Sequence, residues 1–152
     1  MRRLWRSALA ALSLVAFIWS CAAADLWLRA RSAYRRAELY LSWQSDPGAK
    51  RAFFDAELAR VEGELARDFS QGRLTAETMD QRLALARHRR DERVSESSLK
   101  YAYAWLRAAS ELHAPPESPW SAEARRRLPE IRRLWESELR AQGVRFDSYQ
   151  LD

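Results

Sequence analysis

The sequence has almost no cysteine, and this scarcity excludes several classes of protein. Its single cysteine, Cys21, lies inside an apolar run near the N-terminus. One cysteine forms no disulfide within the chain, makes no Cys-based zinc site and lacks the Cys-x-x-Cys-His spacing of a covalent haem attachment. Disulfide scaffolds, cysteine–zinc modules and c-type haem proteins are therefore excluded.

Glycine and proline are also scarce, with four and five residues among 152. The glycines are isolated from one another, so neither a Walker loop nor a dinucleotide-binding loop is present. Ala, Leu, Arg and Glu are abundant instead, and these residues favour helices. We therefore expect an all-α fold: an N-terminal single transmembrane helix that runs into an amphipathic stalk, then a small bundle of helical hairpins.

Lysine is nearly absent, because Lys50 and Lys100 are the only lysines beside 24 arginines. The net charge is +5. The guanidinium group binds phosphates and carboxylates bidentately, which would suit an anionic partner. The arginines are, however, spread along the chain among 21 acids, and codon bias in a GC-rich genome produces the same pattern.

The residue types that enzymes use do not form a recognisable motif. His88 and His113 are the two histidines, and neither has the Glu, His or Cys neighbours of a metal site. No Gly-x-Ser-x-Gly turn is present. We predict no catalytic, cofactor-binding or metal-binding residues and no small-molecule substrate, so the protein is expected not to be an enzyme. A helical enzyme without a linear motif is the alternative.

The N-terminal segment has the properties of a membrane anchor. No charge occurs in the 18 residues from Ser7 to Ala24, close to the ~20 residues that cross a bilayer. Trp5 and Trp27 would stand about 33 Å apart along a helix, the spacing of two interfacial aromatic belts. We predict a transmembrane anchor at residues 1–28 with these membrane-interface residues: Arg2, Arg3, Trp5, Arg6, Trp27, Arg29 and Arg31.

Two other interpretations of this segment stay open. A basic start, an apolar run and Ala22-Ala23-Ala24 would also make a signal peptide that is cleaved before Asp25. Cys21 would be the lipidated residue of a lipoprotein, although Trp19 occupies a position where a small residue is usual. The arginines directly after the run hinder export and favour a retained helix.

The basic N-terminus favours a cytoplasmic start of the chain. We therefore expect a single-pass protein of the cell inner membrane with its C-terminal domain in the periplasm. Arg29, Arg31, Arg35 and Arg36 on the far flank favour the opposite orientation.

Residues 29–45 are predicted to form a juxtamembrane amphipathic helix. One face carries apolar side chains at spacings of three and four: Trp27, Ala30, Tyr34, Ala37 and Leu41. This stripe fits a stalk that packs against a partner helix, and it equally fits a helix folded back on its own domain. The sequence Ser45-Asp46-Pro47-Gly48 then predicts a turn.

A helical bundle domain is expected over residues 49–143. Its first helix is predicted from Lys50 to Ser70, with Gly63 as a point of close helix approach. Thr75 would cap the second helix, which either breaks after the charged run 87–93 or continues. The expected apolar stripes are Phe54, Leu58, Val61, Leu65 and Phe69, then Leu99, Ala102, Leu106, Ala109 and His113, and last Leu128, Ile131, Leu134, Trp135 and Leu139.

The last helix is predicted over Pro119–Gln142, with a kink or restart at Pro129 and Gly143 as its end. It carries most of the candidate partner-binding residues, because Trp and Arg are enriched at binding hot spots. A C-terminal tail at residues 144–152 contributes two more. The set is Trp120, Arg125, Arg126, Arg132, Arg133, Trp135, Phe146 and Tyr149. We expect Trp135 to be buried against the bundle or a partner rather than free on the surface. A solvated face balanced by acids is the alternative for the arginines.

These observations favour a non-catalytic, single-pass, membrane-anchored accessory or assembly subunit of a bacterial membrane complex, respiratory or transport. Its partners would be other subunits, with anionic lipid head groups as a further class. Nucleic acid is not expected as a partner. The alternative is an exported helical adaptor or lipoprotein.

Overall fold

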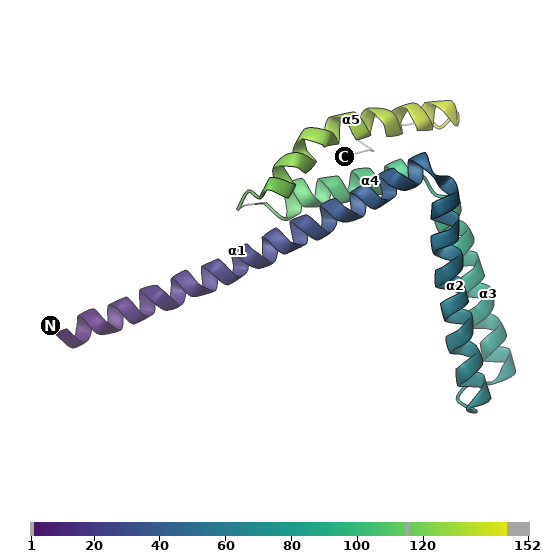
Figure 1. Cartoon of the computed structure of the whole chain (residues 1–152), viewed down its shortest axis with the longest axis horizontal. Helices are drawn as coiled ribbons and strands as arrows, with labels where there is room; N and C mark the ends of the chain where they lie inside the picture. Colours follow the sequence, from purple (N-terminus) through teal and green to yellow (C-terminus); the bar gives the residue numbers. More distant parts are fainter. Residues whose placement is uncertain (1, 115, 146–152) are drawn as a thin grey trace. The chain divides into compact units, whose positions relative to one another are not determined.

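The computed structural model describes residues 2–114 and 116–145, with side chains from residue 12 onward, and it is all-α (Figure 1). Within these residues the helices are α1 (Arg2–Ser45), α2 (Pro47–Ser70), α3 (Ala76–Ser95), α4 (Ser98–Arg107), the π-helical turn η1 (Ala108–Leu112) and α5 (Pro119–Ala141). The predicted fold class is confirmed. Two compact units divide the chain: Met1–Leu39 with Tyr101–Asp152, and Tyr40–Lys100.

Helix α1 changes character along its 44 residues. From residue 12 to residue 29, none of its side chains is buried. Among its large apolar residues there, only Leu26 is half-buried, and the others are 47–67% exposed: Leu12, Leu14, Val15, Phe17, Ile18, Trp19, Trp27 and Leu28. By contrast, Ala30, Ala33 and Ala37 are at most 2% exposed. A single uninterrupted helix therefore joins an uncovered apolar segment to a packed one.

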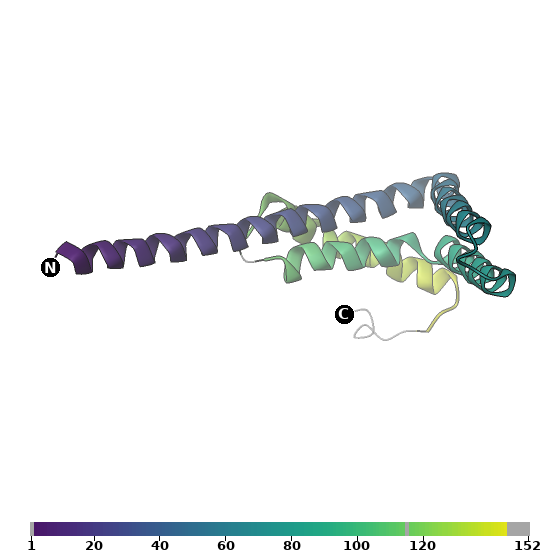
Figure 2. The same cartoon turned by 90° about the horizontal axis from the view of Figure 1, so that it is seen from below.

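The first unit packs the later part of α1 with α4, η1 and α5. Helices α1 and α4 lie side by side and antiparallel in both views (Figures 1 and 2). The stripe predicted for α4 is buried at Leu99, Ala102, Leu106 and Ala109, while His113 at its end is half-buried. Residues 29–39 are therefore folded onto their own domain, one of the two arrangements that the stripe predicted.

Helix α5 begins with a capping box, in which Ser118 accepts from the Ser121 N–H and the Ser121 hydroxyl accepts from the Ser118 N–H. It continues through Pro129 as one bent helix (Figure 1), so the predicted kink is present but no restart occurs. Gly143, at φ +72°, follows the last turn and gives its N–H to the Arg140 carbonyl. The predicted end of the helix at this glycine is confirmed.

The predicted apolar stripe of α5 is wrong at Leu134, which is 46% exposed. Trp135, predicted to be buried against the bundle or a partner, is half-buried within the domain itself. Ile131 is buried at 3% exposure, and the Trp135 ring lies beside the Tyr103 ring, tilted by 36° with 5.5 Å between centroids. Positions 134 and 135 lie about 100° apart around the helix axis, so a face that turns Trp135 toward Tyr103 turns Leu134 away from it.

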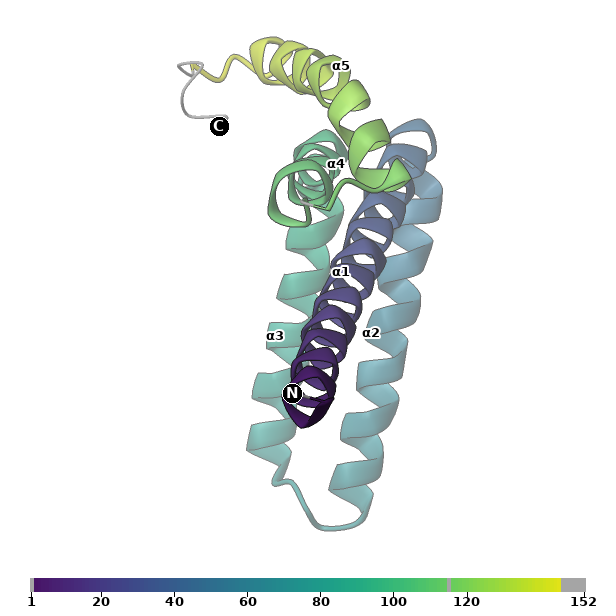
Figure 3. The same ribbon diagram turned by 90° about the vertical axis from the view of Figure 1, so that its left-hand side faces the viewer.

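The second unit is built on an antiparallel hairpin of α2 and α3, whose connecting turn is visible in Figure 3. The predicted turn at residues 45–48 is wrong in extent. Only Asp46 lies between the helices; its side chain caps α2 by accepting from the Ala49 N–H at 3.0 Å, and Pro47 and Gly48 belong to the first turn. Pro is well suited to that position because its missing N–H would have no helical partner.

The other ends of the hairpin follow the sequence. Gly72, at φ +69°, closes α2 and donates to the Phe69 carbonyl, and Thr75 caps α3 through the Thr78 N–H, as predicted. Helix α3 ends before Glu96, which decides the break that the sequence left open. Gly63 does not mark a close approach, since a Cβ there would meet no atom within 4 Å.

An aromatic cluster fills the core of this unit. Trp43, 4% exposed, has ring centroids 4.9–5.4 Å from those of Tyr40, Phe53 and Phe54. Lys50 is 5% exposed and donates from its ammonium group to the Glu96 carbonyl at the end of α3. This fixes the start of α2 beside the end of α3.

Candidate functional site

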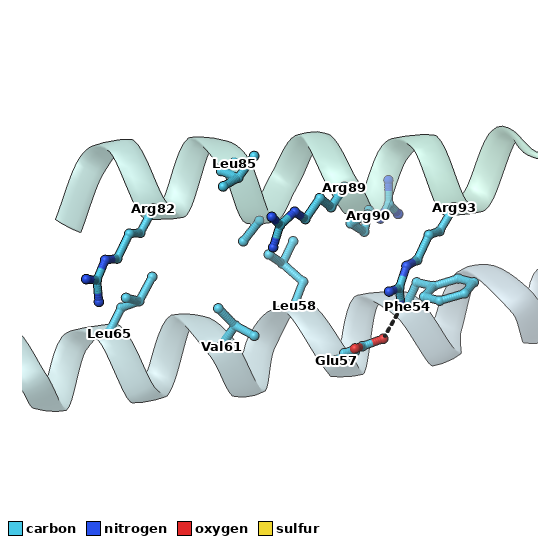
Figure 4. A pocket seen from close by; sticks show the side chains of 11 residues that line it. Phe54, Glu57, Leu58, Val61, Leu65, Arg82, Leu85, Arg89, Arg90 and Arg93 are labelled. Carbon is cyan, nitrogen blue, oxygen red and sulfur yellow. Dashed lines mark hydrogen bonds and ion pairs between the residues drawn. The ribbon is translucent and has the colours of Figure 1, made fainter. Parts of the chain in front are cut away.

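A groove runs along the hairpin between α2 and α3, and Figure 4 shows the side chains that line it. Its volume is about 320 Å³. Helix α2 contributes Phe54, Glu57, Leu58, Val61 and Leu65, and α3 contributes Arg82, Leu85, Ala86, Arg89, Arg90 and Arg93. The groove therefore has an apolar wall on one helix and a basic rim on the other.

The apolar part of the groove is open. Phe54 and Leu65 are buried, but Leu58 and Val61 are half-buried and Leu85 is 47% exposed. None of the residues of α3 is buried. The hairpin thus leaves part of its own apolar seam in contact with solvent.

Two of the four rim arginines are held by carboxylates of α2. Arg90 donates to Asp55 at 2.7 Å and to Asp91 at the same distance. The hydrogen bonds to Asp91 and Asp55 raise the pKa of Arg90 above its usual value. Arg93 lies 3.5 Å from a Glu57 carboxylate oxygen, with its guanidinium over the Phe54 ring. These contacts fix both arginines to the neighbouring helix.

The other two rim arginines have no carboxylate partner among the residues that the structure describes. Within the described part of the chain, Arg82 and Arg89 form no ion pair or hydrogen bond, and both are exposed. Their guanidinium groups therefore remain available for a carboxylate or phosphate outside this unit.

The sequence contains a usable signal for this groove that the prediction for α3 did not include. The sequence analysis predicts for the charged run 87–93 only that the helix either breaks after it or continues. Arg82, Arg89 and Arg93 stand at spacings of seven and four with Leu85 and Ala86 between them, so they share one face of α3. A helical projection of this segment would have revealed a basic, partly apolar stripe.

The predicted arginines of α5 behave differently, because most of them pair within their own unit. Arg125 donates to Glu117 at 2.6 Å and to the Ser110 carbonyl at 3.4 Å. Arg126 pairs with Glu123 at 2.7 Å and Arg132 with Glu136 at 3.2 Å. Arg133 is exposed and forms no such pair among the described residues. Charge balance by neighbouring acids is thus the dominant feature of this helix.

The predicted tryptophans of α5 are partly used inside the domain. Trp120 is half-buried, with its ring 5.6 Å from Tyr34 of α1 and the Arg31 guanidinium 5.8 Å above it. Trp135 contacts Tyr103 as described above. Phe146 and Tyr149 lie outside the described residues. Both tryptophans therefore already have an aromatic partner inside their own unit.

Arg127, which is not among the predicted partner-binding residues, links α5 to α1. It donates to the Tyr34 hydroxyl at 2.9 Å and pairs with Glu38. Partial burial acts to lower the pKa of Arg127, but the Tyr34 hydrogen bond and the Glu38 charge outweigh it and raise that pKa overall. This arginine therefore stays charged and acts as a fixed link between the two helices.

The predicted membrane-interface residues fall in two groups. Arg2, Arg3, Trp5 and Arg6 lie on α1 but their side chains are outside the described residues. Trp27 is 47% exposed, and Arg29 pairs with Asp25 at 2.7 Å one turn earlier. That pair offsets the charge of Asp25 where the apolar run ends.

Helix α1 is also the described helix that is long and apolar enough to cross a membrane, with a mean hydropathy of 1.4 in its most apolar window. Signal sequences near an N-terminus share these properties. Across residues 2–114 and 116–145, no three His, Cys, Asp or Glu side chains gather as metal ligands. His88 lies 3.5 Å from Glu92, and both are exposed.

Comparisons with protein-family models, with curated proteins and with solved structures give no match for this chain.

Proposed function

We propose that this chain is a non-catalytic, single-pass, membrane-anchored accessory or assembly subunit of a bacterial inner-membrane complex, respiratory or transport. Its helical domain would lie in the periplasm and bind other subunits. The protein partners, the membrane side and the absence of an activity are all parts of this proposal.

The observation that carries the proposal is the contrast along α1. Its apolar segment from residue 12 onward is uncovered, whereas Ala30, Ala33 and Ala37 on the same helix are packed in the domain. Burial of apolar surface contributes about 25 cal/mol for each Å² removed from water. An uncovered segment of this length therefore favours a bilayer, and the continuous helix ties the domain directly to it.

Membrane retention is tested by fractionation of cells that express the full chain. The anchor predicts a protein that resists alkaline carbonate, needs detergent for extraction and keeps its N-terminal residues by intact mass. Val15→Arg with Ile18→Arg should release it, because each arginine costs about 2.5–3.5 kcal/mol at the centre of a membrane helix. Leu112→Arg with Val144→Arg, at two exposed apolar positions outside α1, is the matched control and should stay in the membrane.

Cleavage is the outcome that would replace the anchor. A mature protein beginning at Asp25 would keep Ala30–Ala37 and hence the domain, but it would be soluble in carbonate without detergent. A diacylated Cys21 would appear as a mass increase on the N-terminal peptide. Either result overturns the transmembrane part of the proposal.

Subunit membership is tested separately by purification in a mild detergent. We expect the tagged full chain to co-purify at constant stoichiometry with one or more membrane proteins. An isolated monomer under these conditions contradicts the accessory-subunit role. A periplasm-specific reporter fused after Asp152 would be active if the domain lies outside the cytoplasm, and an inactive one would reverse the orientation.

A further inference from the structure

We infer that the groove between α2 and α3 is the docking site for an amphipathic helix of a protein partner, one that carries carboxylates beside its apolar stripe. This inference rests on the proposed function, which requires a partner-binding surface. It names the surface and the chemistry of the partner.

The two helices of the hairpin bury less apolar surface than the helices of a packed bundle. Two antiparallel helices cover each other along one line only, and helices of globular proteins normally bury a stripe at least 100° wide. Here α3 buries none of its residues, and Leu85 is 47% exposed beside half-buried Leu58 and Val61. A third helix laid in the groove would cover these three side chains together.

The dimensions of the groove set the length of the occupant. From Phe54 to Leu65 on α2, and from Arg82 to Arg93 on α3, eleven residues separate the ends of the lining. At 1.5 Å per residue each wall is about 16 Å long. The groove thus accommodates about three turns of helix.

The unpaired charges select an acidic helix. Arg82 and Arg89 stand seven residues apart, so they project from the same side of α3 with Leu85 and Ala86 between them (Figure 4). A helix packed along α3 repeats this spacing, and two of its carboxylates seven residues apart would meet both guanidinium groups. Arg90 and Arg93 are already held by Asp55 and Glu57 and stiffen the rim.

The distribution of charge favours a helix over an anionic lipid. A lipid carries its charge at one end of a long apolar chain. In the groove, cations stand on both sides of the apolar patch made by Leu85 and Ala86. This alternation along the groove matches the side of an amphipathic helix.

The test uses the full chain in phosphatidylcholine nanodiscs and a synthetic probe. The probe is a fluorescein-labelled 18-residue helical peptide with a leucine stripe flanked by glutamates seven residues apart, and binding is read by fluorescence anisotropy. We expect saturable binding that Arg82→Glu with Arg89→Glu weakens at least tenfold. Arg35→Glu with Arg145→Glu changes the net charge equally at exposed positions outside the groove, and it should change binding less than twofold.

A second peptide distinguishes a loss of binding caused by charge reversal from one caused by unfolding of the variant. The same sequence with lysine in place of glutamate should bind the Arg82→Glu/Arg89→Glu protein at least tenfold better than the unchanged protein. An unfolded variant could not gain binding in this way. Equal losses in the two charge-reversal variants, or no saturable binding of the glutamate peptide, would overturn the inference.

An anionic lipid is the remaining occupant that the experiment resolves. If phosphatidylglycerol in the nanodisc protects the amides of residues 54–65 from hydrogen exchange in an Arg82- and Arg89-dependent way while the peptide does not bind, the occupant is a lipid and the inference fails. A different measurement contradicts the proposed function, namely release of the full chain into the carbonate-soluble fraction. A protein that stays in the membrane but ignores the peptide contradicts the groove inference alone.

Discussion

The guanidinium group of Arg36 lies over the indole ring of Trp105, with its central carbon 4.5 Å from the ring centroid. This contact joins α1 to α4 just beyond the apolar segment of α1. A second contact between Tyr34 and Trp120 joins the same helix to α5. The arginines that follow the apolar run therefore serve packing as well as any electrostatic role at a membrane surface.

Replacing Arg36 by alanine should loosen α1 from α4. A cation–π contact at a partly exposed site is worth about 0.5–1 kcal/mol, so we expect a free energy of unfolding lower by about that amount for the full chain in detergent. Arg35→Ala is the matched control, because Arg35 is exposed and has no described ion pair. An equal decrease in the free energy of unfolding of both variants would show that the contact between Arg36 and Trp105 does not stabilise the fold.

The two lysines of the chain give a sharper comparison. Lys50 is 5% exposed and reaches the Glu96 carbonyl, whereas Lys100 is exposed and pairs with the Glu96 carboxylate at 3.4 Å. Lys50→Arg should cost about 1–3 kcal/mol, since a larger head group must enter a filled site. Lys100→Arg should be nearly neutral, which thermal unfolding of the two variants can establish.

If both substitutions proved neutral, the choice of lysine at position 50 would have no packing reason. Codon usage would then be the only explanation for the scarcity of lysine in this chain. The contrast between the two sites therefore tests whether arginine was excluded from this buried position by its size.

Much of this fold could be predicted from periodicity and end signals. The buried stripe of α4, the Thr75 cap and the Gly143 terminus follow from local chemistry that the sequence displays directly. The errors arose where tertiary packing decides. Leu134 matches the apolar period of α5 yet is exposed, because the period does not show how many neighbours a helix has.

The candidate site was harder to predict for the same reason. Arginines next to tryptophans drew attention to α5, but Glu117, Glu123 and Glu136 neutralise three of those arginines in the fold. Two arginines without a described carboxylate partner, Arg82 and Arg89, instead stand on α3, at positions that look like any charged surface helix. These arginines line a groove only because α2 packs beside α3. The local sequence of α3 does not show this tertiary contact.

Trp135→Ala measures how much a half-buried tryptophan contributes. Its ring lies beside buried Tyr103, so we expect a loss of about 2 kcal/mol rather than the 3–5 kcal/mol of a fully buried ring. A double-mutant cycle with Tyr103→Leu should give a coupling of about 1 kcal/mol. A coupling near zero would mean that the two rings are adjacent without stabilising each other.

The junction between the uncovered and the packed parts of α1 can be located with one substitution made at two alanines. Ala37 is 0% exposed and Ala24 is exposed on the same helix. Ala37→Leu should cost about 1–3 kcal/mol in the unfolding of the domain, because three extra carbon atoms must enter a filled interface. Ala24→Leu adds the same atoms to the apolar segment and should leave both the unfolding and the carbonate resistance unchanged. Should Ala37→Leu instead be neutral while Ala24→Leu destabilises, the packed face of α1 would begin before residue 30, and the boundary between anchor and domain would move toward the N-terminus.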